Sequence, residues 1–331
     1  MKRIGNLMPE IATLDNLYLA YYKARRGKHW KQEVLDFERN LQDHLLALQA
    51  ELVTGKIAVG DYHYFRIYDP KERQICAASF RERVLHHALM NVCHAHFERY
   101  QIHDSYACRV GKGSHAAVIR AREFSKKNRY FAKLDVRKYF ETIDHNKLKV
   151  ALARVFKDQT LLQIFYDGID AYEIEQNKGV PIGNLTSQYF ANHFLAQADH
   201  FVKETLSAKY YVRYMDDMVL WHNDLKILNA QVKSLENYLL DVLGCTPKQS
   251  VISRVKRGLP FLGYVVWHNK LSLAKRSRKR FLRNMKRLTH DLRHNIITER
   301  TYQSKILPIL AFLLPTNSFL FRKSVLLRLE T

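Results

Sequence analysis

The chain has 331 residues, of which 47% are hydrophobic and 26% are charged, a composition typical of a globular protein with a sizeable core. Its 54 lysines and arginines outnumber its 32 acidic residues and leave a net charge of +22, spread over the whole length. An excess of this size is typical of proteins that bind a polyanion such as nucleic acid. The even spread disfavours a basic tail, and an anionic membrane surface stays open as an alternative.

The cysteines indicate a reducing environment. Cys76, Cys93, Cys108 and Cys245 lie far apart and form no Cys-x-x-Cys pair, which suits neither a zinc site nor a disulfide framework. The first residues lack the apolar core of a signal peptide, and the most apolar run, 306–314, is too short to span a bilayer. We therefore expect a cytoplasmic protein.

The N-terminal part predicts helices followed by a hairpin. Residues 10–55 read as helix, because leucines between residues 41 and 52 recur at three- and four-residue spacing. Residues 62–77 alternate on both sides of a proline-containing turn, which predicts two antiparallel strands. Lys71 and Arg73 would lie at or near the tip, where lysine and arginine can clamp a triphosphate. Two solvated turn residues are the alternative.

The next stretch predicts two helices joined by a glycine-rich loop. Ser79 and Glu82 form a capping box that opens a helix to about residue 100. Its histidines have no acidic partner at suitable spacing, so we interpret them as core or surface residues rather than metal ligands. In the loop, two glycines flank Lys112, which suits close approach to a backbone or phosphate. A second helix is predicted over 114–127.

A first carboxylate of interest follows a short apolar strand. Residues 131–134 predict the strand, Asp135 ends it, and a turn leads on to the aromatic pair Tyr139 and Phe140. A carboxylate at a strand end can be held rigidly enough to bind a metal ion, and a helix cap is the alternative. Residues 145–172 predict two further helices.

Two more carboxylates lie side by side in the run Tyr211–Leu220. Asp216 and Asp217 separate two strand-like segments, which predicts a tight hairpin. Adjacent carboxylates repel each other, and a magnesium ion would supply the compensating charge, whereas a solvated turn is the alternative. Together with Asp135, the pair would provide the three acids of a two-metal site, whose carboxylates converge from neighbouring strands.

The remaining chain alternates helices and short strands. We expect a helix from Asn184 to about Leu206, an amphipathic helix over 224–243, a strand around 251–255 and a turn-rich stretch over 258–267. From Lys275 a basic amphipathic helix follows, which fits an element that tracks a duplex backbone and, as a rival, a membrane-surface helix. Short apolar helices around Pro308 and Pro315 complete the chain.

Tyr214-Met215-Asp216-Asp217 resembles the Tyr-X-Asp-Asp box of reverse transcriptases, and ordered motifs from about residue 60 to 270 resemble the rest of that family. The resemblance implies an α+β right-hand polymerase fold with fingers, a ferredoxin-like palm sheet bearing the three acids, and a small helical thumb. The expected divisions are fingers and palm over 1–268 (fingers mainly 1–128 and 150–182, palm mainly 129–149 and 183–268) and a helical thumb over 269–331.

The resemblance also implies a reaction, in which a primer 3′-hydroxyl attacks the α-phosphate of a dNTP under the direction of an RNA template. Asp135 and Asp216 would bridge two magnesium ions, Asp217 would bind one of them, and the backbone carbonyl of Val136 would be a further ligand. Lys248 stands where the family has a lysine near the departing pyrophosphate and would act as general acid, with a solvated turn lysine as the alternative.

Further residues match motifs that bind the substrates in this family. Lys71 and Arg73 resemble a fingers hairpin that holds the triphosphate, and Phe140 stands where a bulky ring excludes a ribose 2′-hydroxyl, with a core aromatic as the alternative. Ile182 would contact the incoming nucleotide. The expected template and primer contacts are Arg109, Lys112, Gly183 and Gln188, together with Phe261, Leu262, Gly263 and Tyr264. The last four match a hairpin that supports the primer end in this family, with packing of the palm–thumb joint as the alternative for Phe261.

The segment Pro181–Gln188 narrows the resemblance. Most reverse transcriptases read Pro-Gln-Gly where this chain has Ile182, and the run Ile-Gly-Asn-Leu-Thr-Ser-Gln is similar to the reverse transcriptases of diversity-generating retroelements. Those bacterial or phage-encoded enzymes copy a template-repeat RNA with frequent errors opposite adenine. Isoleucine packs but cannot hydrogen-bond to a nucleotide, which weakens discrimination by roughly 1 kcal/mol or more.

The subclass resemblance further implies a small, basic, oligomeric accessory protein, with the terminal helices as the candidate docking surface. We expect no ribonuclease H, endonuclease or maturase extension. Three alternatives stay open: an antiviral defence or retron-type reverse transcriptase, a non-catalytic RNA-binding protein with a vestigial palm, and a membrane-surface protein.

Overall fold

The computed structural model describes residues 2–68, 72–316 and 318–330, with side chains as far as Val325. The chain forms two compact units, each built from three separate segments. The first unit comprises residues 1–103, 135–206 and 234–248, and the second comprises 104–134, 207–233 and 249–331. The expected division into fingers, palm and thumb stays a prediction.

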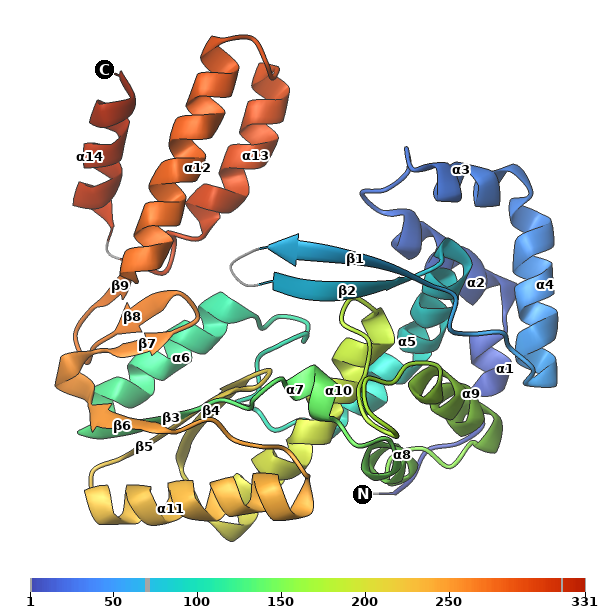
Figure 1. Cartoon of the computed structure of the whole chain (residues 1–331), viewed down its shortest axis with the longest axis horizontal. Helices are drawn as coiled ribbons and strands as arrows, with labels where there is room; N and C mark the ends of the chain where they lie inside the picture. The colour runs from blue at the N-terminus through green and yellow to red at the C-terminus, as the bar shows by residue number, and fades with distance from the viewer. Residues whose placement is uncertain (1, 69–71, 317, 331) are drawn as a thin grey trace. The chain divides into compact units, whose positions relative to one another are not determined.

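The first unit is mainly helical and carries one hairpin (Figure 1). Its elements are α1 Met8–Ile11, α2 Leu14–Arg25, α3 Gln32–Arg39, α4 Leu41–Thr54, β1 Tyr62–Tyr68, β2 Glu72–Ala78, α5 Phe80–Tyr100, α7 Tyr139–Thr142, α8 His145–Ala153, α9 Gln159–Asp170, α10 Leu185–His200 and the π-helical turns η1 Phe201–Thr205 and η2 Tyr238–Val242.

The prediction of one continuous helix over residues 10–55 is wrong, because the structure has four helices there. The first break follows from Thr13, whose hydroxyl accepts a hydrogen bond from Asn16 N and so begins a new helix. A second break follows α2, where Gly27 has a left-handed φ of 71° that a helix cannot contain. Local capping therefore divides a stretch that apolar periodicity alone joins.

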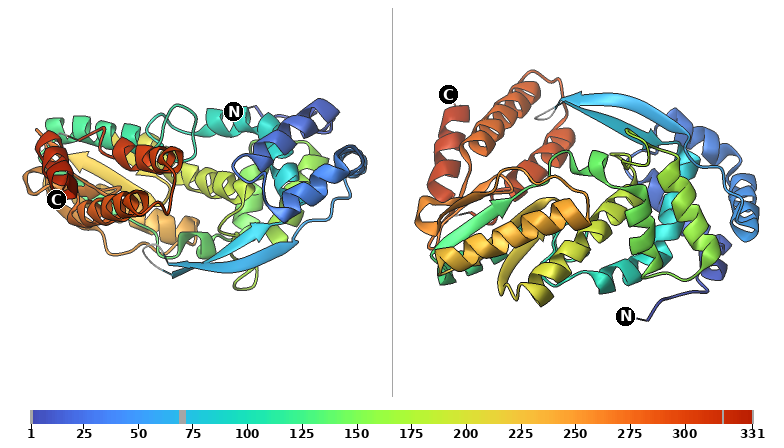
Figure 2. Two further views of the ribbon diagram at one scale, coloured as in Figure 1. Left: turned by 90° about the horizontal axis from the view of Figure 1, so that it is seen from above. Right: turned by 60° about the horizontal axis from the view of Figure 1, so that its bottom comes forward.

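The predicted hairpin is confirmed, with β1 and β2 antiparallel in a register from Tyr62 opposite Ala78 to Tyr68 opposite Glu72. Both views of Figure 2 show it as a long two-stranded ribbon. Its predicted tip residue Lys71 lies outside the described residues. The helix that follows is capped as expected by Ser79, although Glu82 accepts from Gly60 N and so leaves the capping box half formed.

The second unit contains two antiparallel sheets and the C-terminal helices. In both figures α12 and α13 lie side by side (Figures 1 and 2). Its elements are α6 Ser114–Lys127, β3 Tyr130–Leu134, β4 Tyr210–Tyr214, β5 Asp217–His222, the first part of α11 Leu225–Asn237, β6 Val251–Arg254, η3 Val255–Arg257, β7 Leu259–Phe261, β8 Tyr264–Val266, β9 Leu271–Leu273, α12 Lys275–Arg293, α13 Glu299–Ala311 and α14 Phe319–Glu330.

The larger sheet has the strand order β4-β5-β3-β6, and every neighbouring pair is antiparallel. Along the chain, helices separate β3 from β4 and β5 from β6, while a tight turn joins β4 to β5. A β-α-β-β-α-β sequence with this strand order is ferredoxin-like. The expected palm-type sheet is therefore confirmed.

The smaller sheet, β7-β8-β9, packs with α6 and the C-terminal helices around buried Phe261, Tyr264 and Phe281. Short helices are expected around Pro308 and Pro315, and the structure has one of them, α13, continuing through Pro308. Apolar side chains of that helix pack against this core and offset the backbone hydrogen bond that proline removes. Among the described residues, none of the helices is both long and apolar enough to traverse a bilayer.

Candidate active site

The turn between β4 and β5 presents the adjacent acids. Tyr214 pairs with Asp217, so Met215 and Asp216 are the two turn residues. Met215 has a left-handed φ of 51°, which a non-glycine residue adopts at a free-energy cost of roughly 1 kcal/mol. The surrounding structure therefore has to hold this turn in place.

A buried arginine supplies that support. The side chain of Arg213 is fully buried, and its Nη1 donates to the carbonyl of Met215 at 3.1 Å. Its backbone N–H donates to Asp104 O, and its carbonyl accepts from Tyr106 N, each at 3.0 Å. A buried guanidinium is unfavourable unless it is hydrogen-bonded, so the bond from Nη1 joins the Arg213 side chain to the turn, while the backbone bonds fix its strand.

Asp217 has a lysine as its counter-charge. Lys133 Nζ lies 3.0 Å from Asp217 Oδ1, and each side chain is 26% exposed. The contact lacks hydrogen-bond geometry, since Oδ1 is buried and accepts no hydrogen bond from any residue that the structure describes. Lys133 Nζ instead donates to the carbonyl of Pro260 at 3.4 Å. The Asp217 carboxylate thus keeps an unsatisfied oxygen.

Asp135 also pairs with a lysine, within the first unit. Lys248 Nζ donates to Asp135 Oδ1 at 2.7 Å, and Lys248 N donates to Asp135 O at 2.8 Å. A third bond, from Arg137 N to Thr246 O, extends this short ladder around the buried Val136. The predicted pyrophosphate lysine is therefore held beside the predicted metal ligand.

The sheet register relates these acids along the chain. Leu134, the last residue of β3, pairs with Met218, which follows Asp217 in β5, and Asp135 is the residue after Leu134. Carboxylate oxygens are the ligands that magnesium prefers, and the unsatisfied Asp217 oxygen fits such an ion. No group of three or more His, Cys, Asp or Glu residues that could hold a metal is found among the described residues. The metal-binding roles stay predictions.

Three of the predicted nucleotide-binding residues lie in the first unit with the hairpin. Phe140 is half-buried beside Tyr139, and its carbonyl accepts from Val180 N. Ile182 is half-buried, and its carbonyl accepts from Cys76 N in β2 at 2.8 Å. Arg73 is exposed on β2 opposite Ile67. Hydrogen bonds therefore connect the turn before α10 both to the Phe140 segment and to the hairpin.

Gly183 and Gln188 follow at the start of α10. A Cβ on Gly183, whose φ is 131°, would lie 2.9 Å from the carbonyl oxygen of Cys76, so a side chain there would collide with β2 backbone. Asn184 Oδ1 accepts from Ala78 N and fixes the same contact. Gln188 is half-buried one turn further along. The hairpin thus rests directly on the start of α10.

The predicted template loop belongs to the second unit. Arg109 Nη1 donates to Ser105 O at 2.8 Å, and Lys112 Nζ lies 5.0 Å from the centre of the Tyr106 ring. Gly113 N donates to Tyr106 O. Both basic side chains therefore contact the loop that precedes α6, and their role toward a template stays a prediction.

The predicted primer hairpin is the β7–β8 turn. Phe261 and Tyr264 are buried, and Tyr264 stacks on Phe312 at 4.6 Å while its hydroxyl donates to Phe312 O. Leu262 and Gly263, with φ values of 49° and 85°, form the two-residue turn between them. Only these two turn residues are open to a primer, since the rings pack in the core.

Sequence reasoning missed Lys133 and Arg213. Both stand inside apolar strands, where a charged side chain needs a partner. Lys133 is two residues before Asp135 and so lies on the same face of its strand. That alternation was the available signal for Lys133, and the isolated arginine between Val212 and Tyr214 was the signal for Arg213.

The comparison with protein families finds one model, "Reverse transcriptase (RNA-dependent DNA polymerase)", which matches residues 69–266. The COX1/OXI3 intron 2 protein of Saccharomyces cerevisiae is 23% identical over 59% of this chain and 30% of its own length. For the group II intron-encoded protein LtrA of Lactococcus lactis, identity is 23% over 50% of this chain and 29% of LtrA. Protein YkfC of Escherichia coli is 23% identical over 55% of this chain and 51% of its own length. The chain thus spans about a third to a half of these relatives.

Solved structures with the same fold include two yeast telomerases. The telomerase of Candida albicans, in complex with a fragment of telomeric RNA, aligns with a TM-score of 0.51 and 12% identity over 76% of this chain and 55% of its own. The apo telomerase of Candida tropicalis aligns with a TM-score of 0.50 and 12% identity over 66% and 49%. At this identity the likeness concerns the fold alone.

Proposed function

This chain belongs to the reverse transcriptase family, and we propose that it acts as an RNA-directed DNA polymerase. The observation that carries the proposal is the register of β3 against β5, in which Leu134 pairs with Met218. Asp135 directly follows Leu134, and Asp217 directly precedes Met218. Acids at adjacent ends of two antiparallel strands suit the two-metal chemistry of nucleotidyl transfer. The RNA partner of one related telomerase and the net charge of +22 support an RNA template.

In this proposal Asp135, Asp216 and Asp217 hold two magnesium ions, with the Val136 carbonyl as a further ligand. When bound, the ions activate the primer 3′-hydroxyl and neutralise charge on the leaving pyrophosphate. Lys248, whose Nζ lies 2.7 Å from Asp135 Oδ1, would give a proton to that pyrophosphate. Catalysis then comes mostly from alignment and charge neutralisation.

The nucleotide would lie against side chains of the first unit. We assign Phe140 as the ring that excludes a ribose 2′-hydroxyl, so the substrate is a dNTP rather than an NTP. Lys71 and Arg73 hold the triphosphate. Support comes from the hydrogen bonds that join the hairpin, Ile182 and the Phe140 segment into one framework.

The test of activity is dNTP incorporation on a primed RNA by the wild type and by Asp216→Asn. The neutral variant should lose incorporation by about a thousandfold, since one interaction that stabilises developing charge contributes on this scale. Asp43→Asn, which removes an exposed carboxylate on α4, is the matched control and should incorporate normally. Equal incorporation by the wild type and Asp216→Asn would refute the assignment of Asp216, and absence of incorporation by the wild type as well would favour a vestigial palm.

We propose further that the polymerase belongs to a diversity-generating retroelement and copies a template-repeat RNA with errors at adenines. Ile182 carries this finer proposal, because its side chain has no hydrogen-bonding group while its carbonyl is already used by β2. Ile182→Gln should lower misincorporation opposite adenine by several-fold. Ile227→Gln, an exposed change on α11, is the control, and an unchanged error spectrum in Ile182→Gln would reject the idea.

A small, basic accessory protein is the proposed partner of the terminal helices. Large apolar side chains are exposed there, among them Leu307, Leu314 and Leu320 at 64%, 75% and 79%. Two basic proteins repel each other, so apolar contact would have to supply the attraction. Leu307→Ser with Leu314→Ser should abolish co-purification with the basic product of a neighbouring gene, and retained co-purification would exclude this surface.

A further inference from the structure

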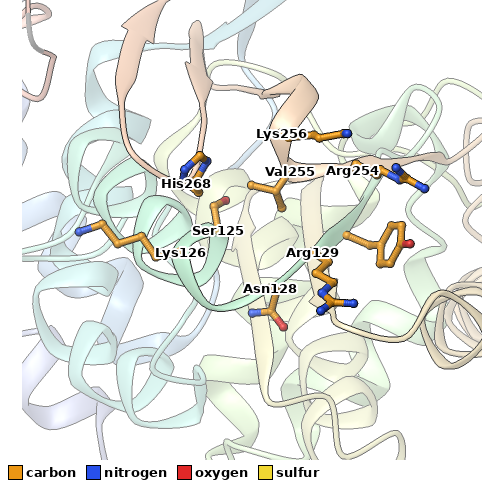
Figure 3. A pocket seen from close by; sticks show the side chains of 9 residues that line it. Ser125, Lys126, Asn128, Arg129, Arg254, Val255, Lys256 and His268 are labelled. Atoms are coloured by element: carbon orange, nitrogen blue, oxygen red, sulfur yellow. The ribbon is translucent and has the colours of Figure 1, made fainter.

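A separate pocket of about 470 Å³ lies in the second unit (Figure 3). It is formed by the end of α6, the start of β3, the end of β6 with η3, and His268, which follows β8. Pockets that bind small ligands have volumes in this range. None of its lining residues belongs to the proposed polymerase site, so the mechanism leaves it without a role.

The pocket is lined with positive charge. Four of its residues are permanently basic and one is a histidine, and Figure 3 shows them around the cavity: Lys126, Arg129, Arg254, Lys256 and His268. All five are exposed, and no carboxylate lines the pocket. Within the described part of the chain none of them forms an ion pair. Their mutual repulsion is therefore uncompensated by the protein.

The backbone beneath these side chains is fixed. Val255 N donates to Arg129 O at 2.9 Å, and Arg254 pairs with Tyr130 across the β3–β6 ladder. Asn128 Nδ2 donates to Phe124 O, and the Ser125 hydroxyl accepts from the buried Trp221 indole. The charged groups thus project from a rigid base, which lowers the entropy lost when a ligand binds.

The pocket lies at the opposite end of the strands from the acidic turn. In β5, Asp217 is at one end, while His222, which pairs with the pocket residue Tyr130, is at the other. Five residues of strand cover roughly 17 Å, or about five nucleotide steps of a helical nucleic-acid strand. A strand bound at the pocket therefore extends beyond the reacting nucleotides.

We propose that this pocket is a second nucleic-acid site, which binds backbone phosphates of the RNA strand outside the polymerase centre. Arginine and lysine bind phosphate oxygens with charge-assisted hydrogen bonds, and Tyr130 offers a ring on which a base can stack. A basic accessory protein is excluded here by like charge. The inference rests on the proposed function only for the choice of RNA as the polyanion.

The experiment measures binding of a single-stranded RNA to the full chain over a range of salt concentrations, for the wild type and for Arg129→Gln with Arg254→Gln. Each lost phosphate contact reduces the log–log salt slope by about 0.7, so two reduce it by about 1.4. Binding should then weaken about 25-fold at 0.1 M salt and hardly at all near 1 M. Lys226→Gln with Lys233→Gln removes the same charge from exposed positions on α11 that do not line the pocket, and should change binding far less.

The outcomes separate this proposal from the polymerase assignment. Under saturating primed RNA the single-turnover incorporation rate of the pocket variant should equal that of the wild type, since the pocket holds no reacting atom. An unchanged salt slope, or an equal change in both double variants, overturns the proposal even if the protein is an active polymerase. A loss confined to DNA strands or to free dNTP also overturns it, whereas weaker binding of RNA supports the site even if no polymerisation is seen.

Discussion

Two aspartate–lysine pairs, one in each unit, resemble each other in composition but differ in how they are held. Asp135 and Lys248 form a 2.7 Å hydrogen bond between side chains that are 34% and 43% exposed. Asp217 and Lys133 form a 3.0 Å ion pair between side chains that are each 26% exposed. The Asp217 Oδ1 atom is buried and accepts no hydrogen bond from the residues that the structure describes.

The difference indicates two roles for a lysine beside a proposed metal-binding acid. In the first pair, backbone hydrogen bonds place Lys248, and water can solvate the carboxylate if the lysine leaves. In the second pair, Lys133 is the counter-charge of a carboxylate that water reaches poorly, so its departure is more costly. A cation that binds at Asp135 would have to compete with the hydrogen-bonded Lys248, whereas at Asp217 it would bind an oxygen that accepts no hydrogen bond from the described residues.

The largest expected effect tests whether the two acids act together. Asp135→Asn and Asp217→Asn should each reduce dNTP incorporation by about a thousandfold, because each removes a carboxylate from the proposed metal site. The double variant should be hardly worse than either single one, since residues that act as a unit are not additive. Single-turnover incorporation measures this, and a fully multiplicative double loss would mean that the acids serve separate functions.

Acid should distinguish the two units by stability. Burial lowers the pKa of His193 in the first unit to about 4, against a hydrogen bond to Ala151 O that raises it, with smaller lowering from His200 and Arg154. His193 binds a proton near pH 6.5 in the unfolded state and only near pH 4 in the folded state. The stability that the neutral, buried imidazole contributes is therefore complete above pH 6.5 and is lost as the pH falls to 4.

By pH 4 the loss should reach up to about 3 kcal/mol, measured as the free energy of unfolding in urea between pH 7 and pH 4. His193→Gln should flatten that dependence in the unit that carries the Asp135 pair. An unaltered pH slope in this variant would exclude His193 as the cause.

Arg213→Gln should lower the free energy of unfolding of the unit that carries Asp217 by about 2 kcal/mol, because the Met215 carbonyl loses its hydrogen-bond donor. Incorporation should fall with it because the acidic turn loses its support. Arg26→Gln, an exposed arginine on the other unit, is the matched control. Thermal unfolding and incorporation are the measurements, and normal activity in Arg213→Gln would show that the turn holds itself.

The smallest expected effect compares the lysines directly. Lys133→Gln should lower the free energy of unfolding by about 1 kcal/mol more than Lys248→Gln, because it uncovers the less exposed carboxylate. High salt should narrow the difference only slightly, since partly buried pairs are screened weakly. Equal losses in urea unfolding would mean that the burial difference has no energetic weight.

Much of the fold follows from local sequence, and the helix over 114–127 and the hairpin from residue 62 match the structure closely. The acidic turn can also be predicted from the sequence, because a strand-like run lies on each side of it. The partners of its charged side chains cannot be predicted in this way. Lys133 reaches Asp217 only through the β3–β5 register, which the alternation of side chains within one strand does not determine.

The basic pocket shows the same limit from another side. Its residues come from three segments, and residues 125–130 precede residues 254–256 and residue 268 by more than a hundred positions. Each segment alone reads as an ordinary solvated surface. Only the pairing of β3 with β6 collects Arg129 and Arg254 around one cavity. Composition predicted a polyanion partner but could not locate this place of contact.

The methionine at position 215 has a consequence for how this protein could be improved. Its left-handed backbone makes glycine the easier residue in the folded turn, and Met215→Gly would relieve that strain while adding conformational freedom to the unfolded chain. The same change would make the turn between β4 and β5 more flexible, so that Asp216 and Asp217 would be held less precisely. The strain at Met215 is thus a stability cost that keeps the acidic turn in one conformation.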